Sequence, residues 1–247
     1  MAADRETRAR SFGSVAAMYE RARPGYPDEA VRWLAGEEAC DVVDLGAGTG
    51  KLTRSLVAQG HRVTAVEPSP EMLAQLAAAV PEAIAVRGSA ESIPLADGAA
   101  DVVTVAQAFH WFDQPVALRE IARVLRRDGR IALVWNARDD TEEWVADFAD
   151  TVVSRSTFRA GGVMLAVGSI DTSGLYGPVE RATFAHVQLL RRGELIELVR
   201  SRSECAVLGE DERGPVLERV GALFDAHAAN GVLAMPYVTE CFRAAKR

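Results

Sequence analysis

Cysteine and lysine are both scarce in this sequence. The three cysteines, Cys40, Cys205 and Cys241, lie far apart and lack metal-ligand spacing, so we expect reduced structural thiols and no zinc site or other metal. Lysine occurs only at positions 51 and 246, and arginine supplies the remaining basic residues. Acidic residues outnumber basic ones, giving a formal net charge of −7. That balance argues against an extended phosphate-binding face, so we expect no nucleic-acid partner.

A long hydrophobic run is missing as well. The longest stretch of glycine and apolar residues, Gly161–Gly168, is far too short to span a bilayer. The first six residues, MAADRE, are charged and precede no apolar core region, which disfavours a signal peptide. We therefore expect a cytoplasmic protein with no membrane partner. With 247 residues, 49% of them hydrophobic, the chain can bury one large α/β core.

The most informative stretch is Val42–Gly50, VVDLGAGTG. Two β-branched residues open an apolar run suited to a strand buried on both faces, and three alternating glycines follow it. Lys51–Ala58 then has the apolar spacing of a helix, and a second apolar stretch, Arg62–Val66, closes on Glu67. This order predicts a nucleotide-type cofactor site at the carboxyl edge of a parallel sheet.

The glycine spacing narrows the choice of cofactor. It is G-x-G-x-G, whereas a dinucleotide pyrophosphate requires G-x-G-x-x-G at the start of the helix. Asp44, two residues before the first glycine, would repel a pyrophosphate but suits an ammonium group or a water bound to one. Glu67 would accept hydrogen bonds from two ribose hydroxyls. A cofactor with an amino acid at one end and a ribose at the other fits both acids, and S-adenosylmethionine is such a molecule.

With these features the chain resembles the class I S-adenosylmethionine-dependent methyltransferases, in the small-molecule branch with methyltransferase type 11 and trans-aconitate methyltransferase-like proteins. Val66–Leu73 is similar to the second motif of the family. Gly88–Leu95 is similar to the adenine-contacting segment, with Ser89 where relatives often carry Asp, and Asp101–Phe112 to the loop beside the reacting methyl. The resemblance implies cofactor contacts from Asp44, Gly46, Ala47, Gly48, Glu67, Pro68, Met72, Ser89, Ala90, Glu91, Ala106 and Gln107.

The segment Ser11–Pro27 carries the spacing Y-x-x-x-R-P-x-Y-P, which resembles an N-terminal segment of the same branch. There the segment packs across the cofactor, which would add Tyr19 and Arg23 to the site. The alternative is a helix fastened to the sheet by Phe12 and Tyr19.

The remaining pattern alternates strands with helices. Strands are predicted at 41–45, 62–66, 83–86, 102–106 and 130–135, and helices at 51–58, 70–79 and 115–126. Beyond them we expect helices at 142–155, 193–200 and 211–228, strands at 183–190 and 237–242, and a glycine-rich loop at 160–179 that closes over substrate. The fold class is α/β, a doubly wound Rossmann-like sheet, to which the resemblance adds seven strands, an antiparallel last strand and a lid or insertion.

We expect one methyltransferase domain over 1–247. It divides into a cap segment at 1–35, a cofactor-binding core at 41–136, a substrate-side insertion with helices at 137–231 and a final strand at 232–247. A homodimer is a further possibility.

Methyl transfer needs the acceptor in line with the methyl, about 3–3.5 Å away, and favours a dry pocket. Phe109, Trp111 and Phe112 either line such a pocket or pack in the core. His110 is a candidate general base for a hydroxyl acceptor, a hydrogen-bond donor to substrate, or a residue that holds the loop. A carboxylate acceptor needs no base, and an arginine clamp would replace it. Candidates for that clamp are Arg23, Arg138, Arg155 and Arg159.

Three rival functions fit the sequence less well. A same-fold enzyme of other chemistry, such as an aminopropyl transferase, normally needs paired acids near the fourth motif, where this chain has AQAFHW. A non-catalytic cofactor-binding or interaction protein is disfavoured by the intact glycines with Asp44 and Glu67. A nicotinamide oxidoreductase is disfavoured by the glycine spacing. The leading prediction is a methyltransferase that uses S-adenosylmethionine on a small molecule with a carboxylate or hydroxyl acceptor.

Overall fold

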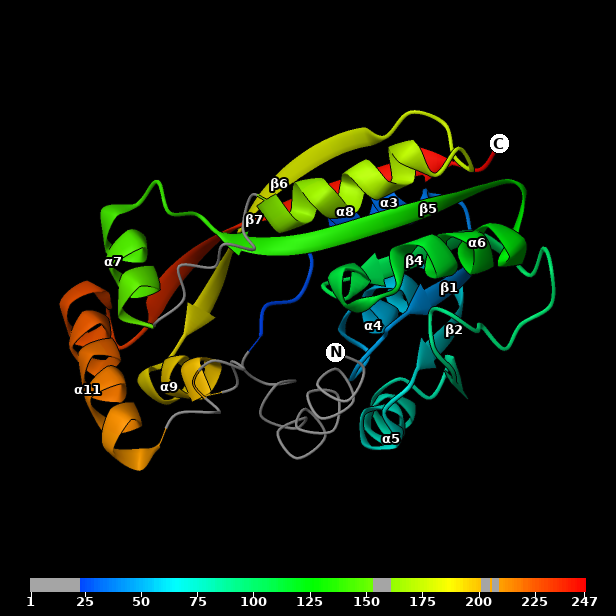
Figure 1. The fold of residues 1–247 in the computed structure, drawn as a ribbon. Helices are drawn as coiled ribbons and strands as arrows, with labels where there is room; N and C mark the ends of the chain where they lie inside the picture. Colours follow the sequence, from blue (N-terminus) through cyan, green and yellow to red (C-terminus); the bar gives the residue numbers. More distant parts are fainter. Residues whose placement is uncertain (1–22, 153–160, 201–204, 206–208) are drawn as a thin grey trace.

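The computed structural model describes residues 23–152, 161–200, 205 and 209–247. Tyr19, a predicted site residue, lies outside them, as do Arg155 and Arg159. The described chain builds a seven-stranded sheet in the order β3-β2-β1-β4-β5-β7-β6 (Figure 1). Its strands are β1 Asp41–Leu45, β2 Arg62–Glu67, β3 Ile84–Arg87, β4 Ala100–Ala106, β5 Leu125–Arg138, β6 Glu180–Leu190 and β7 Leu233–Ala245.

The strand directions confirm the predicted fold class. Strands β1 to β5 pair in parallel, whereas β7 is antiparallel to both β5 and β6. The chain order reverses between β1 and β4, which lie side by side at the centre of the sheet. In a doubly wound sheet a ligand binds outside the carboxyl ends of the strands at such a reversal. The glycine turn after β1 and the loop after β4 both lie there.

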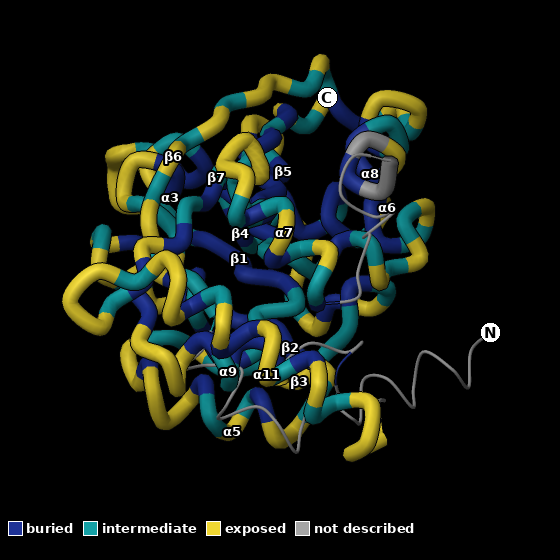
Figure 2. The backbone as a smooth tube through the Cα atoms, turned by 90° about the vertical axis from the view of Figure 1, so that its left-hand side faces the viewer, coloured by how far each residue is buried: buried dark blue, intermediate teal, exposed yellow. Residues whose placement is uncertain are grey.

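Helices cover both faces of the sheet. Helices α3 (Asp28–Ala35) and α4 (Lys51–Ala58) bury apolar side chains against one face, and α6 (Gln114–Val124) and α8 (Gly161–Thr172) against the other. Figure 2 shows the central strands as the most buried part of the backbone. The β-branched runs of β1 and β4 therefore form continuous buried strands because both of their faces are covered.

A third cluster lies at the far end of the sheet. Helices α7 (Glu143–Thr151), α9 (Arg192–Arg200) and α11 (Glu210–His227) pack on the extension of β6 and β7 (Figure 1, left). Its core includes Phe148, Leu195, Phe224 and Tyr237. The antiparallel strands are thus long enough to serve two clusters, one over the parallel sheet and one beyond it.

The predicted loop at 160–179 is wrong. Most of it forms α8, with Val163, Ala166, Val167 and Ile170 all buried against the core that contains α6. These four residues follow the i, i+3, i+4, i+7 spacing of one helix face. Each glycine costs a helix about 1 kcal/mol, but fully burying a large apolar side chain contributes roughly 1.5–3 kcal/mol. The free energy gained by packing therefore exceeds the cost of the glycines, and this segment is a packed helix rather than a mobile lid.

The other differences concern element ends and one additional helix. The third predicted helix ends at Val124 rather than 126, because β5 begins at Leu125. Strands β5, β6 and β7 run further than predicted, since each pairs along nearly its whole length. Helix α3 was not predicted; Pro27 occupies its N-cap and four of its residues are buried. In the described chain no helix is both long and apolar enough to cross a bilayer.

Candidate active site

The turn after β1 is built so that only glycine fits. Gly46, Gly48 and Gly50 have φ angles of 68°, 59° and 91°, the left-handed region that disfavours other residues. The amides of Gly46 and Ala47 both donate to the carbonyl of Val66, at 2.8 and 3.2 Å. A Cβ placed on Gly46 would lie 2.9 Å from that of Ala108. The turn therefore packs closely between the end of β2 and the residues that follow β4.

A cavity opens over this turn. It is lined by Arg23, Pro24, Tyr26, Gly46, Ala47, Gly48, Thr49, Lys51, Leu52, Ala106, Gln107 and Asn136. Six predicted cofactor contacts are among these residues: Arg23, Gly46, Ala47, Gly48, Ala106 and Gln107. The predicted motifs at the ends of β1 and β4 therefore meet at one place.

Glu67 lies beside the turn and is only 6% exposed. Its Oε2 accepts the amide of Gly48 and its Oε1 the amide of Ser69, both at 2.9 Å. Burial raises the pKa of this carboxyl, while the two amide hydrogen bonds lower it. The amides fix the direction of the carboxylate, and each oxygen keeps a further lone pair for a ligand hydroxyl.

Asp44 lies beneath the cavity lining, deeper than a residue that contacts a bound ligand directly. It is completely buried, and Thr53 and Thr104 donate to its two oxygens at 2.6 and 3.0 Å. Burial, with a smaller contribution from Glu67, raises its pKa to about 6, and the two threonine hydroxyls oppose the shift. The carboxylate thus ties the first turn of α4 to β4 underneath the glycines. It lies below the cavity lining rather than in it.

The end of β4 carries a strained residue. Gln107 has a φ of 58°, which a non-glycine residue adopts at a cost of order 1–3 kcal/mol. Its amide donates to the carbonyl of Val134 at 2.9 Å, and its side chain reaches the carbonyl of Asn136 at 3.4 Å. These bonds hold Gln107 in the cavity wall.

The three aromatic residues after Gln107 occupy different environments. Phe109 is fully buried in the core, whereas Trp111 is 44% exposed. Phe112 packs on the edge of Phe109, with ring centroids 5.8 Å apart, and lies against the position where Gly46 would carry a Cβ. Phe109 is therefore a core residue, Phe112 lies beside the glycine turn, and Trp111 is exposed at the surface.

His110 stands between Phe109 and Trp111 in a short 3-10 helix and is half-buried, its ring 4.6 Å from that of Trp111. Burial lowers its pKa to about 4. The imidazole is consequently neutral at physiological pH, but its conjugate acid is too strong for an efficient general base, whose pKa should lie near the working pH.

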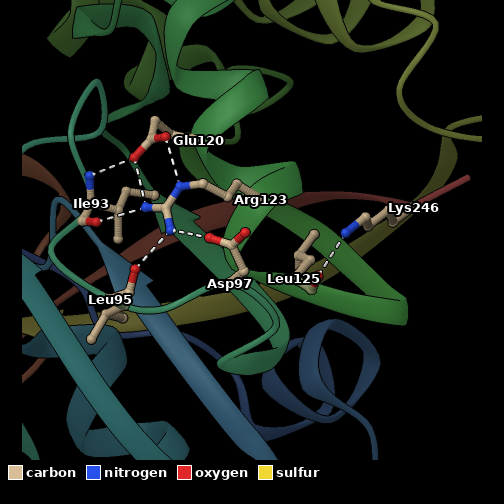
Figure 3. A network of polar contacts seen from close by, with 7 residues as sticks. All are labelled: Ile93, Leu95, Asp97, Glu120, Arg123, Leu125 and Lys246. Atoms are coloured by element: carbon tan, nitrogen blue, oxygen red, sulfur yellow. Dashed lines mark hydrogen bonds and ion pairs between the residues drawn. The ribbon is translucent and has the colours of Figure 1, made fainter.

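The predicted adenine-contacting loop is held by Arg123 of α6 (Figure 3). The guanidinium binds Glu120 and Asp97 and donates to the carbonyls of Ile93 and Leu95 at 2.9 and 2.8 Å. Glu120 in turn accepts the amide of Ile93 at 3.0 Å. The loop is thereby fixed without a helix of its own.

Within that loop the predicted residues differ in position. Ala90 is buried and belongs to the core cluster that contains α6. Glu91 accepts the amide of Asp113, the N-cap of α6, at 2.9 Å, and Ser89 forms an isolated bridge to Ser92. On α5 (Pro70–Ala79), the sulfur of Met72 lies 4.0 Å from the Cβ position of Gly48, while Pro68, just before its Ser69 N-cap, is exposed.

The described part of the cap segment lies over the same cavity. Arg23, Pro24 and Tyr26 line it, and the side-chain amide of Asn136 donates to the carbonyl of Gly25 at 2.9 Å. Tyr26 also packs against the core beneath α3. The described residues Arg23–Pro27 therefore lie at the cavity, whereas the alternative helix with Phe12 and Tyr19 falls outside the described residues.

Several functional neighbours were not predicted. Asn136, Thr49, Lys51 and Leu52 line the cavity, and Thr53 and Thr104 bind Asp44. Thr104 is a polar residue inside an apolar strand, and Asn136 follows the apolar run of β5 near the carboxyl edge, so both had a sequence signal. Among the candidate clamp residues, Arg138 also lies at the end of β5, its guanidinium carbon 4.7 Å above the Phe148 ring.

All three cysteines are free thiols, as predicted. In the ranges given above, His, Cys, Asp and Glu side chains nowhere gather in threes to hold a metal ion.

Comparisons with known proteins agree with this geometry. Residues 43–133 match the methyltransferase domain family. An uncharacterized methyltransferase of Mycobacterium tuberculosis is 44% identical over 248 residues, covering 99% of this chain and 99% of the relative. An uncharacterized methyltransferase-like protein of Schizosaccharomyces pombe is 34% identical over 212 residues, covering 84% of this chain and 83% of the relative.

The fold has solved counterparts. The crystal structure of a protein assigned to the methyltransferases of an antibiotic biosynthesis pathway in Anabaena variabilis has a TM-score of 0.60 at 22% identity and covers 87% of this chain and 95% of that one. Sheet order, glycine turn, buried acids and full-length relatives point the same way: the chain belongs to the class I S-adenosylmethionine-dependent methyltransferases.

Proposed function

We propose that this methyltransferase binds S-adenosylmethionine in the cavity over the glycine turn and methylates a small-molecule carboxylate. The bound cofactor supplies an electrophilic methyl group on a cationic sulfonium. The observation that carries the cofactor assignment is the pair of buried acids, Asp44 and Glu67, beneath and beside glycines of left-handed φ. Two carboxylates favour a cationic ligand and oppose the pyrophosphate of a dinucleotide.

The chain's own residues would divide the cofactor between them. Glu67, fixed by two backbone amides, has lone pairs left for the ribose hydroxyls. The absence of Cβ atoms on Gly46 and Gly48 lets the ligand approach the backbone. Asp44 places negative charge under the turn, where an ammonium group would lie above it, directly or through water. Met72, Ser89 and Glu91 are proposed for the adenosine side, and Ala47, Pro68, Ala106 and Gln107 for contacts along the turn and the end of β4.

A carboxylate acceptor is favoured over a hydroxyl by the state of His110. A hydroxyl has to lose a proton during transfer, and a histidine of pKa about 4 has little driving force to take it. A carboxylate is already ionised at neutral pH. Arg23 in the cavity wall and Arg138 at the end of β5 supply the positive charge that would orient such an acceptor.

The first experiment tests the cofactor assignment and the acceptor assignment separately. Calorimetry with S-adenosylhomocysteine should give saturable heat, and NAD at the same concentration should give none. Transfer of labelled methyl should then be measured with matched pairs of small acids and their alcohols. Labelling of the acids supports the proposal. Labelling of the alcohols, abolished by His110→Ala, would replace it with the hydroxyl mechanism.

We further propose that the cap segment (1–35), the core (41–136), the substrate-side region (137–231) and the final strand (232–247) act as parts of one domain. The three helices α7, α9 and α11 share a core of their own with the ends of β6 and β7, which supports a distinct substrate-side region. The homodimer stays a prediction, to be tested by sedimentation of the full chain.

A further inference from the structure

A chain of hydrogen bonds crosses three strands and ends on the cap segment. His186 of β6 contacts the hydroxyl of Thr239 on β7, with 3.2 Å between Nδ1 and Oγ1. Thr239 Oγ1 lies 2.7 Å from Asn136 Oδ1 on β5. The Asn136 side-chain nitrogen lies 2.9 Å from the carbonyl oxygen of Gly25. An edge strand is thereby linked to a segment that lines the cofactor cavity.

The hydrogen-bonding capacities of these four groups assign the direction of each bond. The carbonyl of Gly25 can only accept, so the NH2 group of Asn136 must face it and its oxygen must face Thr239. The single hydroxyl proton of Thr239 then points to Asn136 Oδ1, and its oxygen can only accept from His186. His186 must therefore carry a proton on Nδ1. Protonation of Nε2 would leave this arrangement unchanged, and burial lowers the pKa of the imidazole in any case.

The chain is placed where it can act on the cofactor. Asn136 itself lines the cavity, and so do Pro24 and Tyr26 on either side of Gly25. After Pro27 the chain enters α3, which is anchored by buried Val31 and Leu34. The segment Arg23–Pro27 thus lies at the cavity directly before this anchored helix, and its carbonyl at Gly25 is hydrogen-bonded to Asn136, another lining residue.

We propose that Asn136 is a positioning residue that holds the segment Arg23–Pro27 closed over the cofactor, with Thr239 and His186 setting the direction of its amide. This inference rests on the proposed cofactor site. Its role is retention of the bound cofactor, so its loss should affect the cofactor KM more than the turnover number.

Substitutions separate the hydrogen-bonding role from packing. Asn136→Asp is nearly isosteric but places an oxygen opposite the carbonyl of Gly25, which turns attraction into repulsion. Thr239→Val removes the hydroxyl that orients Asn136, whereas Thr239→Ser keeps it and serves as the matched control. Thr239 is completely buried, whereas Asn136 is half-exposed, so Asn136→Asp carries the test if Thr239→Val lowers stability.

The experiment measures binding and release of S-adenosylhomocysteine by calorimetry and stopped-flow fluorescence, beside thermal unfolding. Breaking a hydrogen bond and leaving its partner unsatisfied costs about 1–3 kcal/mol, so Asn136→Asp should weaken binding about 5- to 150-fold, mostly through faster release. Thr239→Val should have a smaller effect in the same direction, and Thr239→Ser should bind like the wild type. The cofactor KM should rise by a larger factor than any change in the turnover number at saturating cofactor.

Two failures are distinguishable. If the wild type does not bind S-adenosylhomocysteine, the proposed cofactor site is wrong. If the wild type binds and Asn136→Asp binds and releases it at the same rates, the site stands and the role of Asn136 is refuted. An equal fall in turnover number would likewise refute a pure retention role.

Discussion

Replacing Asp44 with Asn should stabilise this enzyme at neutral pH and weaken its hold on the cofactor. Asp44 is completely buried, and burial raises its pKa from the ordinary 3.8 to about 6. A carboxyl whose pKa rises on folding binds its proton more tightly in the folded state. This tighter proton binding therefore adds to the free energy of unfolding below about pH 3.8. The added stability is lost as the pH rises to about 6.

The size of this destabilisation follows from the pKa shift of Asp44. A shift of about 2 units corresponds to about 3 kcal/mol of destabilisation once the pH exceeds both values. Asparagine has the same shape and stays neutral, and the hydroxyls of Thr53 and Thr104 can each donate or accept, so both contacts can persist. The gain in unfolding free energy of Asp44→Asn over the wild type should grow by about 1–2 kcal/mol between pH 5 and pH 8.

The assay is urea denaturation of both proteins across that range, where comparison cancels the titration of all other groups. Asp101→Asn is the control of opposite sign, because the ion pair with Arg126 holds the pKa of Asp101 below its usual range against the effect of burial. Parallel stability profiles for Asp44→Asn and the wild type would refute the reasoning.

The same charge should govern cofactor binding. If ionised Asp44 favours the ammonium group, wild-type affinity for S-adenosylhomocysteine should fall about tenfold between pH 7 and pH 5, since only the ionised form binds tightly. Asp44→Asn should bind more weakly at pH 7 and lose most of that pH dependence. The raised pKa of Glu67 leaves a residual dependence in the variant.

Three further predictions follow from the site. Gly46→Ala should destabilise the protein by about 1–2 kcal/mol more than Gly98→Ala in chemical denaturation, because both glycines have positive φ but only Gly46 would press a Cβ on Ala108. Equal losses would show that the contact relaxes freely. Glu67→Ala should weaken S-adenosylhomocysteine binding about 30-fold or more, whereas Glu67→Gln, which keeps an acceptor, should lose less; unchanged affinity in both would place the ribose elsewhere. His110→Ala should retain most of its turnover on a carboxylate acceptor, and the wild-type rate should be flat over roughly pH 6–9, because the pKa of His110 is about 4. A loss of about 100-fold or more would restore the general-base role.

Local sequence patterns were enough to predict the parallel half of the fold. The strand, glycine turn and helix of residues 42–58 are specified by β-branched runs, glycines of positive φ and apolar spacing, all properties of neighbouring residues. For the same reason Gly46, Gly48 and Glu67 could be predicted as cofactor contacts before any packing was known. The order of four motifs along the chain then identified the enzyme family.

Helix α8 shows the limit of local reasoning. Its glycines predict a loop, and its one-sided apolar spacing predicts a helix, so the two local signals conflict. The conflict is resolved by the surface that Val163 and Ile170 meet, formed in part by α6, which lies far earlier in the chain. Burial of that face is a property of the assembled core rather than of the segment.

Sequence alone thus determined the chemistry of the turn, the cofactor class and the strand–helix alternation, because these depend on residues close together in the chain. Tertiary structure alone decided that Asp44 lies under the turn with Thr104, 60 residues away, and that Asn136 meets Thr239, 103 residues away. It also decided that His110 is half-buried, and this burial lowers its pKa to about 4. Hydrogen-bond partners and burial are set by which distant strands become neighbours, and no local spacing encodes that.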